Sequence, residues 1–147
     1  QSHTDLVKGI VCAENGRIFS VGYDKAICVY DADKPKEESV RIEKCHEGAI
    51  CSVAFDTDNN WLITGSYDGT VKIWSQEGRC LDVFDGLSDT VTGLAYVNST
   101  KTYWITGKGR KVVAYDPRMP ANITAFIKDT SRFDEFVIHK LHQVPMS

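Results

Sequence analysis

Residues 46–74 read HEGAICSVAFDTDNNWLITGSYDGTVKIW, and this stretch decides the fold. Within it, residues 50–55, 61–66 and 70–74 are short runs rich in apolar, β-branched and aromatic side chains, which is typical of β-strands. The residues between the runs are largely Asp, Asn and Gly, which tolerate the backbone angles of tight turns. A fourth run follows at residues 80–84. The stretch therefore predicts four short strands joined by hairpins, an antiparallel meander.

The same pattern recurs along the chain at spacings of roughly 40 residues, within the range of repeat architectures. Units begin at His3, His46 and Leu87. Expected second strands lie at residues 17–22 and 103–107, third strands at 26–31 and 112–116, fourth strands at 39–44 and 122–127, and the first strand of a further unit at 134–138. The sequence thus predicts units at residues 3–45, 46–86 and 87–130, followed by a first strand within residues 134–147.

The second unit resembles the WD40 repeat. It has His46 at its start, a Gly-Ser pair at the end of its second strand, an Asp68-Gly turn and a closing Trp74. The first unit looks like the same repeat, with His3 and Asp24 in the corresponding places and a Tyr-Asp ending. The resemblance covers about residues 3–145. It implies an all-β chain made of four-stranded β-propeller blades.

The third unit is a degenerate version of this repeat. Leu87 stands where the repeat has His, the turn is a shorter Lys-Gly-Arg, and Tyr115-Asp116 replaces Trp-Asp. A propeller blade carries apolar residues on both faces, so blades stack radially, and a closed ring needs roughly 4–8 of them. We therefore expect an incomplete ring, an excerpt of a longer propeller whose remaining blades lie in the same or another chain.

The resemblance also implies a structural hydrogen-bonded set in each well-preserved unit. This set joins the repeat's His, a Ser or Thr of the second strand, the turn Asp and the closing aromatic residue. Carried over by motif, it comprises His46, Ser66, Asp68 and Trp74 in the second unit, and His3, Asp24 and Tyr30 in the first. Although Ser, His and Asp also make catalytic triads, we expect this set to satisfy buried polar groups, and we expect no catalytic residue.

Composition narrows the function classes. The 147 residues are 42% hydrophobic and 25% charged, which is typical of folded globular domains. The net charge of −3 argues against a nucleic-acid partner, and no apolar run is long enough to cross a membrane. The five cysteines include no C-x-x-C pair, so we expect free thiols of an intracellular, cytoplasmic protein rather than a disulfide framework or a metal site. No cofactor is expected.

Peptide partners of WD40 propellers commonly bind the face formed by the loops before the first strands and between the second and third strands. Mapped by motif, the exposed positions there are Leu6, Lys8, Tyr23, Ala49, Cys51, Tyr67, Thr90, Thr92 and Gly109. Tyr23 and Tyr67 occupy equivalent places in neighbouring units. Because tyrosine is enriched at binding hot spots, these two residues are candidate contacts for a partner protein or peptide, although packing between adjacent loops would also explain them.

The expected function is that of a non-catalytic scaffold or adaptor for other proteins. An alternative comes from Tyr115-Asp-Pro-Arg118, which resembles the ending through which some WD40 proteins dock on the adaptor of cullin-type ubiquitin ligases. Arg118 would be the anchor, because a guanidinium makes bidentate hydrogen bonds. A cytoskeletal or ciliary scaffold subunit is a further alternative that no particular residue favours.

Overall fold

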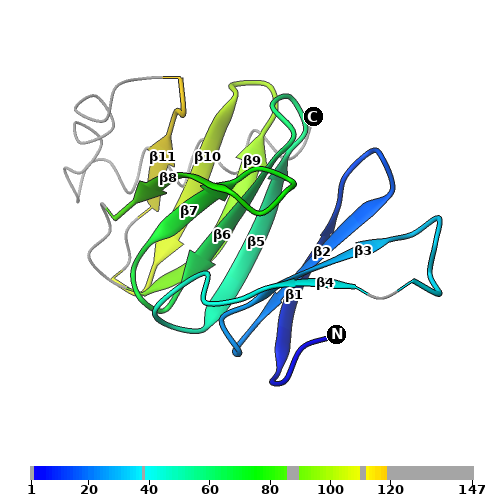
Figure 1. Cartoon of the computed structure of the whole chain (residues 1–147). Coiled ribbons are helices and arrows are strands. Elements are labelled where there is room, and N and C mark those ends of the chain that lie inside the picture. Colours follow the sequence, from blue (N-terminus) through cyan, green and yellow to red (C-terminus); the bar gives the residue numbers. More distant parts are fainter. Residues whose placement is uncertain (1, 38, 86–89, 110–111, 119–147) are drawn as a thin grey trace.

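The computed structural model describes residues 2–37, 39–85, 90–109 and 112–118. These residues form three antiparallel sheets that follow one another along the chain (Figure 1). The first contains β1 (Val7–Cys12), β2 (Arg17–Gly22), β3 (Ile27–Asp31) and β4 (Val40–Ile42); the second contains β5 (Ile50–Asp56), β6 (Trp61–Ser66), β7 (Val71–Trp74) and β8 (Cys80–Phe84); the third contains β9 (Val91–Val97), β10 (Thr102–Gly107) and β11 (Val112–Tyr115). Strands pair in chain order within each sheet, so the predicted all-β meanders are confirmed.

Turn residues explain where the strands stop. Gly16, Gly69 and Gly78 close hairpins with φ values of 87°, 87° and 90°, in the left-handed region that glycine adopts without a steric penalty. Asn60 takes the same region at φ 59° in the turn between β5 and β6. The expected strands at residues 122–127 and 134–138 lie outside the described residues, and so does Leu87.

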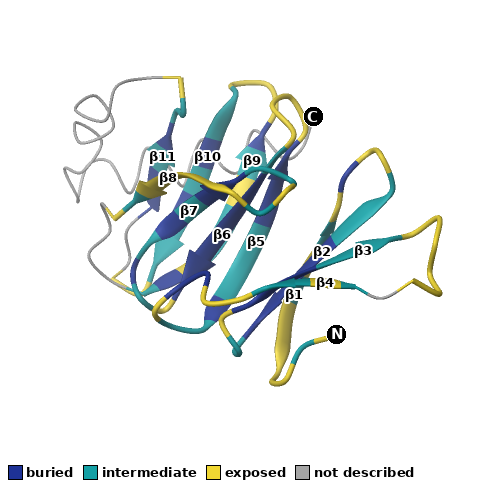
Figure 2. Cartoon of the chain, viewed as in Figure 1, coloured by how far each residue is buried: buried dark blue, intermediate teal, exposed yellow. Residues whose placement is uncertain are grey.

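The second sheet lies between the other two, so its strands β5 to β7 are largely buried, whereas β8 is mostly exposed. Its central strand β6 is buried along almost its whole length, as Figure 2 shows. Alternate residues of β6 point to opposite faces, so Leu62 packs in the core shared with the first sheet and Ile63 in the core shared with the third. These described sheets do not close a ring.

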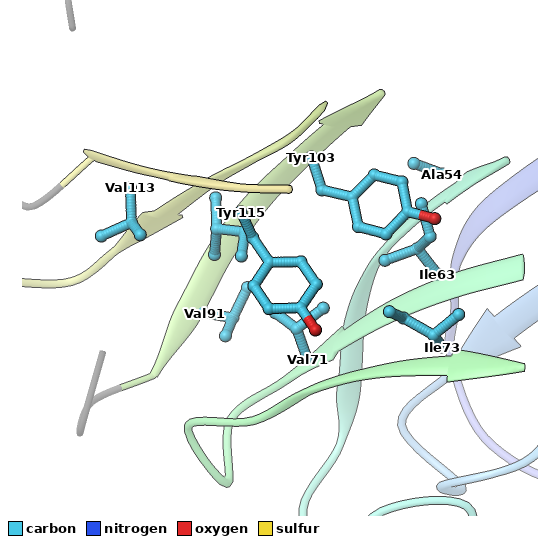
Figure 3. Packing of buried hydrophobic residues seen from close by; sticks show 9 residues of the cluster. Ala54, Ile63, Val71, Ile73, Val91, Tyr103, Val113 and Tyr115 are labelled. Carbon is cyan, nitrogen blue, oxygen red and sulfur yellow. The ribbon is translucent and has the colours of Figure 1, made fainter. Parts of the chain in front are cut away.

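Each interface between sheets has its own aromatic packing. Between the first and second sheets, Phe19 stacks on Phe55 with ring centroids 6.0 Å apart. Between the second and third, Tyr103 stacks on Tyr115 with centroids 6.0 Å apart, above Ile63 and its neighbours (Figure 3). Burial of such side chains between sheets is the main source of stabilisation. A single sheet would leave them exposed to water and would lack this contribution.

A buried carboxylate also joins the second and third sheets. Asp56, at the end of β5, is fully buried, and the hydroxyl of Tyr103 in β10 donates to its Oδ2 at 2.6 Å. The same carboxylate accepts bonds from the backbone N–H groups of Asp58 and Asn59 and from the Asn59 side chain. Burial raises the pKa of Asp56, but these four hydrogen bonds outweigh it and the pKa is lowered overall.

Candidate functional site

A chain of hydrogen bonds runs through the second sheet from Trp74 to Asp68. The indole Nε1 of Trp74 donates to Thr64 Oγ1 at 2.8 Å, and Thr64 Oγ1 lies 2.7 Å from His46 Nε2. Since the Thr64 hydroxyl oxygen accepts a hydrogen bond from the indole, the Thr64 hydroxyl can donate its own proton to His46 Nε2. The other ring nitrogen then carries the His46 proton and donates it to Asp68 Oδ2, 3.1 Å away. Every member of the chain is thereby satisfied with a neutral imidazole.

Thr64, rather than Ser66, is the hydroxyl that links His46 to Trp74. Trp74 pairs with Leu62, so its side chain reaches the next residue on that face of β6, which is Thr64. Ser66 lies two residues further along and serves the turn. Its hydroxyl donates to the Ala49 carbonyl at 2.9 Å and accepts from the Asp68 N–H at 3.0 Å.

The first sheet repeats this arrangement with Ser20 in place of Thr64. Ser20 Oγ lies 2.7 Å from His3 Nε2 and donates to the Tyr30 hydroxyl at 3.4 Å, while His3 Nδ1 lies 2.9 Å from Asp24 Oδ1. Sequence reasoning missed both Ser20 and Thr64. The aligned second strands contained the signal, because residue 20 matches residue 64 and both carry hydroxyls, whereas Ser66 matches Gly22.

The His46 set cannot work as a catalytic triad in this arrangement. Thr64, which would be the nucleophile, is 0% exposed, and the His46 side chain is equally enclosed. A substrate therefore has no path to the hydroxyl. The set acts by holding the turn between β6 and β7 against the segment that precedes β5, because Asp68 also accepts the Glu47 N–H at 3.0 Å.

The burial of His46 predicts a pH dependence of stability. Burial lowers its pKa below the ordinary value of 6.5, although the nearby Asp68 carboxylate partly opposes this. The unfolded chain therefore takes up a proton below about pH 6.5 that the folded chain resists. The free energy of unfolding is expected to fall as the pH drops from 7 towards the lowered pKa, by at most about 1.4 kcal/mol per pH unit.

Urea unfolding at pH 7.0 and 5.5 measures this effect. His46→Asn lowers stability at both pH values, but it should flatten the difference between them. An unchanged pH slope in His46→Asn would rule out this origin of the acid sensitivity.

The loops before the first strands and the turns after the second strands lie at one end of the three sheets and form a surface that we call the tyrosine face. Each sheet contributes three residues to this face: one in the loop before its first strand, one at a bulge in that strand and one at the turn after its second strand. In this order they are Leu6, Lys8 and Tyr23 in the first sheet, Ala49, Cys51 and Tyr67 in the second, and Thr90, Thr92 and Lys108 in the third. Three equivalent backbone bonds define it, from Tyr23 N to Leu6 O (2.9 Å), from Tyr67 N to Ala49 O (3.0 Å) and from Lys108 N to Thr90 O (3.0 Å).

These repeated bonds correct one position predicted from the sequence. Lys108, not Gly109, occupies in the third sheet the place of Tyr23 and Tyr67. The shorter turn of that unit shifts the alignment by one residue, which the sequence pattern left ambiguous. Gly109 is the next residue and is exposed.

A β-bulge marks the same point in the first strand of every sheet. The register skips Lys8 in β1, Cys51 in β5 and Thr92 in β9, so each of these residues is left without a paired partner across the ladder. Bulges re-aim side chains and are common beside functional sites. Lys8 and Thr92 are exposed, whereas Cys51 is half-buried.

Tyr23 and Tyr67 meet across the boundary between the first and second sheets. Their hydroxyl oxygens lie 3.1 Å apart and their ring centroids 5.8 Å apart. The ammonium of Lys8 lies 5.9 Å from the centre of the Tyr23 ring, within range of a cation–π interaction. Tyr67 is 48% exposed. The hydrogen bond with Tyr23 raises the pKa of Tyr67, which stays protonated at neutral pH.

Other members of the tyrosine face mainly join the second sheet to the third. Cys51 Sγ donates to the Val91 carbonyl at 2.6 Å, and Thr90 Oγ1 donates to the Tyr67 carbonyl at 3.3 Å. Burial raises the pKa of the Cys51 thiol, and the nearby Lys8 ammonium partly opposes this increase. The Cys51 thiol is therefore protonated at neutral pH. Leu6 is more than half exposed, and Ala49 is half-buried.

Arg118 lies at the other end of the sheets, beside the turn between β9 and β10. Its Nε and one terminal nitrogen donate to the two carboxylate oxygens of Asp116 at 3.0 and 2.8 Å, and that terminal nitrogen also reaches the Thr100 carbonyl at 3.3 Å. The guanidinium is thus occupied by its own turn, although its side chain is 58% exposed.

All five cysteines are free thiols, of which Cys12 and Cys80 are exposed. Among the described residues, no group of three or more His, Cys, Asp or Glu side chains is arranged to hold a metal ion. None of the described segments is a helix long and apolar enough to span a membrane.

Comparisons with known proteins agree with this geometry. Residues 37–75 match the family model described as "WD domain, G-beta repeat". NACHT domain- and WD repeat-containing protein 1 of Homo sapiens is 29% identical over 94 residues, which is 62% of this chain and 6% of that protein. Pre-mRNA-processing factor 19 of Bos taurus is 24% identical over 133 residues, which is 86% of this chain and 26% of that protein.

The solved structure of U3-55K has the same fold. It matches with a TM-score of 0.73 at 22% identity, over 80% of this chain and 38% of that chain. The chain thus spans about a quarter or less of the two curated relatives and well under half of this solved chain. The chain thus contains a WD40 repeat at residues 37–75, and its described sheets have the arrangement of β-propeller blades.

Proposed function

We propose that this protein is a non-catalytic WD40 scaffold that binds a partner protein or peptide on the tyrosine face. The carrying observation is the Tyr23–Tyr67 pair, which presents aromatic surface and hydroxyl groups at the junction of two blades. Tyrosine gives large contact area and a hydrogen-bonding group with few rotatable bonds, which is why it is frequent at binding hot spots. The three turns around the pair are held by repeated backbone bonds, so the surface is rigid before the partner arrives.

We also propose that further blades, in the same or another chain, cover the free face of the first blade. That face exposes apolar side chains of β1, with Ile10 66% exposed and Val7 about half exposed. Together with Ile18, Tyr30 and Pro35 they line a shallow depression. A large apolar sheet face left in water favours aggregation, and a neighbouring blade would bury it as the second blade buries the opposite face.

An intracellular location fits this function. Free thiols persist in reducing compartments, and one relative is named for pre-mRNA processing. Docking on a ubiquitin-ligase adaptor through Arg118 is not favoured by a specific contact, because the guanidinium is bound to Asp116.

Replacing both tyrosines tests the scaffold function. Tyr23→Ala combined with Tyr67→Ala is expected to weaken capture of partner proteins about tenfold or more, since each residue is a hot-spot type at the centre of the face. Quantitative mass spectrometry of proteins that copurify with wild type and variant measures the effect. The melting temperature should change little, because Tyr67 is half exposed and its partner lies at the same surface.

Glu14→Ala combined with Lys36→Ala is the matched control, since both residues are exposed at the opposite ends of the strands. This control should leave the captured set unchanged. Equal capture by the tyrosine variant, or a fall in melting temperature like that of a core substitution, would show that the tyrosines only pack on each other.

A further inference from the structure

Two lysines of the tyrosine face have no carboxylate partner among the described residues, whereas the turn carboxylates Asp24 and Asp68 are bonded within their own blades. Asp24 accepts bonds from His3, from the Thr4 N–H and from Arg41, and Asp68 accepts from His46 and the Glu47 N–H. Burial raises the pKa of Asp24, but hydrogen bonds from Arg41, Thr4 N–H and His3 lower it overall to about 2. Both carboxylates therefore act inside their own blades.

The lysines of this face differ in this respect. Among the described residues, no carboxylate oxygen lies within ion-pair distance of Lys8 or Lys108, and both side chains belong to exposed residues. Lys8 stands on a bulge and leans over the Tyr23 ring, which limits its freedom without neutralising its charge. A positioned ammonium with three N–H donors is ready for an anionic group.

The tyrosine hydroxyls add a donor next to this charge. In the Tyr23–Tyr67 hydrogen bond one hydroxyl donates and the other accepts, so one of the two protons is left to donate outward. Hydrogen bonds to ionised acceptors are the stronger kind, and an acceptor shared by a hydroxyl and an ammonium gains both charge and direction.

From these contacts we propose that the tyrosine face binds an acidic peptide segment, with an Asp or Glu carboxylate held between the Lys8 ammonium and the hydroxyls of Tyr23 and Tyr67. Lys108 occupies on the third blade the place that Tyr23 and Tyr67 occupy on the first two. It therefore extends the positive surface along the direction in which a peptide would cross the blades. This inference rests on the proposed scaffold function and specifies the chemistry of its partner.

Selection from a random 12-residue peptide library displayed on phage tests the proposal. Wild type is expected to enrich peptides containing Asp or Glu, and Lys8→Gln is expected to lose this enrichment. A synthetic peptide from the wild-type selection should bind Lys8→Gln about fivefold more weakly, and its affinity for wild type should fall as salt is raised. Tyr67→Phe, which removes the hydroxyl but keeps the ring, should weaken the same peptide and spare neutral ones.

Lys36→Gln removes the same charge from an exposed lysine at the other end of the first blade and should keep the acidic enrichment. The proposal is overturned by selected peptides without acidic residues, by acidic enrichment that survives Lys8→Gln, or by an equal loss in Lys36→Gln. Neutral peptides whose binding depends on Tyr23 and Tyr67 would leave the scaffold function standing while removing this inference. Selected peptides indifferent to the tyrosines would remove both.

Discussion

Asp56→Ala is expected to lower the free energy of unfolding by about 3–4 kcal/mol. The substitution removes a buried acceptor of four hydrogen bonds and leaves the Tyr103 hydroxyl buried without a partner between two blades. A loss of this size is a large part of the stability of a typical domain. Urea unfolding of wild type and variant, followed by tryptophan fluorescence, measures it.

Two further variants show where that loss arises. Tyr103→Phe removes the one donor to Asp56 that comes from the third blade and should cost about 2 kcal/mol. Its effect should overlap with that of Asp56→Ala in a double-mutant cycle, because both break the same contact. Asp58→Ala makes the same chemical change two residues away, at a carboxylate that meets Lys101, Tyr96 and Asn98 at the surface, and should cost much less. Equal losses for Asp56→Ala and Asp58→Ala would contradict the role of burial.

Thr64→Val is expected to lower the free energy of unfolding by about 3 kcal/mol. Valine has nearly the same shape as threonine, so packing is retained while the hydroxyl is lost. The loss leaves two buried groups without partners, the indole N–H of Trp74 and the Nε2 of His46. Thermal unfolding monitored by circular dichroism, together with urea unfolding, gives the change.

Ser66→Ala is the matched control for Thr64→Val. Ser66 is equally buried and lies two residues away on the same face of β6, but its hydroxyl serves the turn through Ala49 and Asp68. Its removal should cost about 1 kcal/mol. If Ser66→Ala proved the more damaging change, the hydrogen-bonded chain through Thr64 would not be the one that stabilises the blade.

Strand positions and the blade pattern could be predicted from the sequence because they depend on local properties. Alternating apolar residues, Asp-Gly and Asn-containing turns, and the recurring His placed most of the strands from β2 to β8 within one residue of their observed limits. The short β4 was the exception, since only Val40–Ile42 of the expected residues 39–44 pair with β3. Edge strands pair on one side only, so their ends are weakly specified by pattern.

Which hydroxyl bonds to His46 could not be predicted by motif position alone. Thr64 and Ser66 share a face of β6, and the choice between them depends on where Trp74 of β7 pairs across the sheet. In the third blade, a turn one residue shorter moved the equivalent position from Gly109 to Lys108, and the backbone bond to Thr90 reveals it. Both points depend on strand register. The hydrophobic pattern determines which face of a sheet a side chain lies on, but it does not determine which residue of the neighbouring strand that side chain contacts.

The sequence by itself determined the β-meanders, the WD40 resemblance and the two equivalent tyrosines, because these follow from residue type and spacing. The tertiary structure alone decided that Tyr23 and Tyr67 hydrogen-bond to each other, that Lys8 stands on a bulge above Tyr23, and that Asp56 reaches across to Tyr103. The physical reason is that the Tyr23–Tyr67 and Asp56–Tyr103 contacts join residues 44 and 47 positions apart, whose distance is set by how one blade packs on the next, whereas the place of Lys8 depends on the register of β1 against β2.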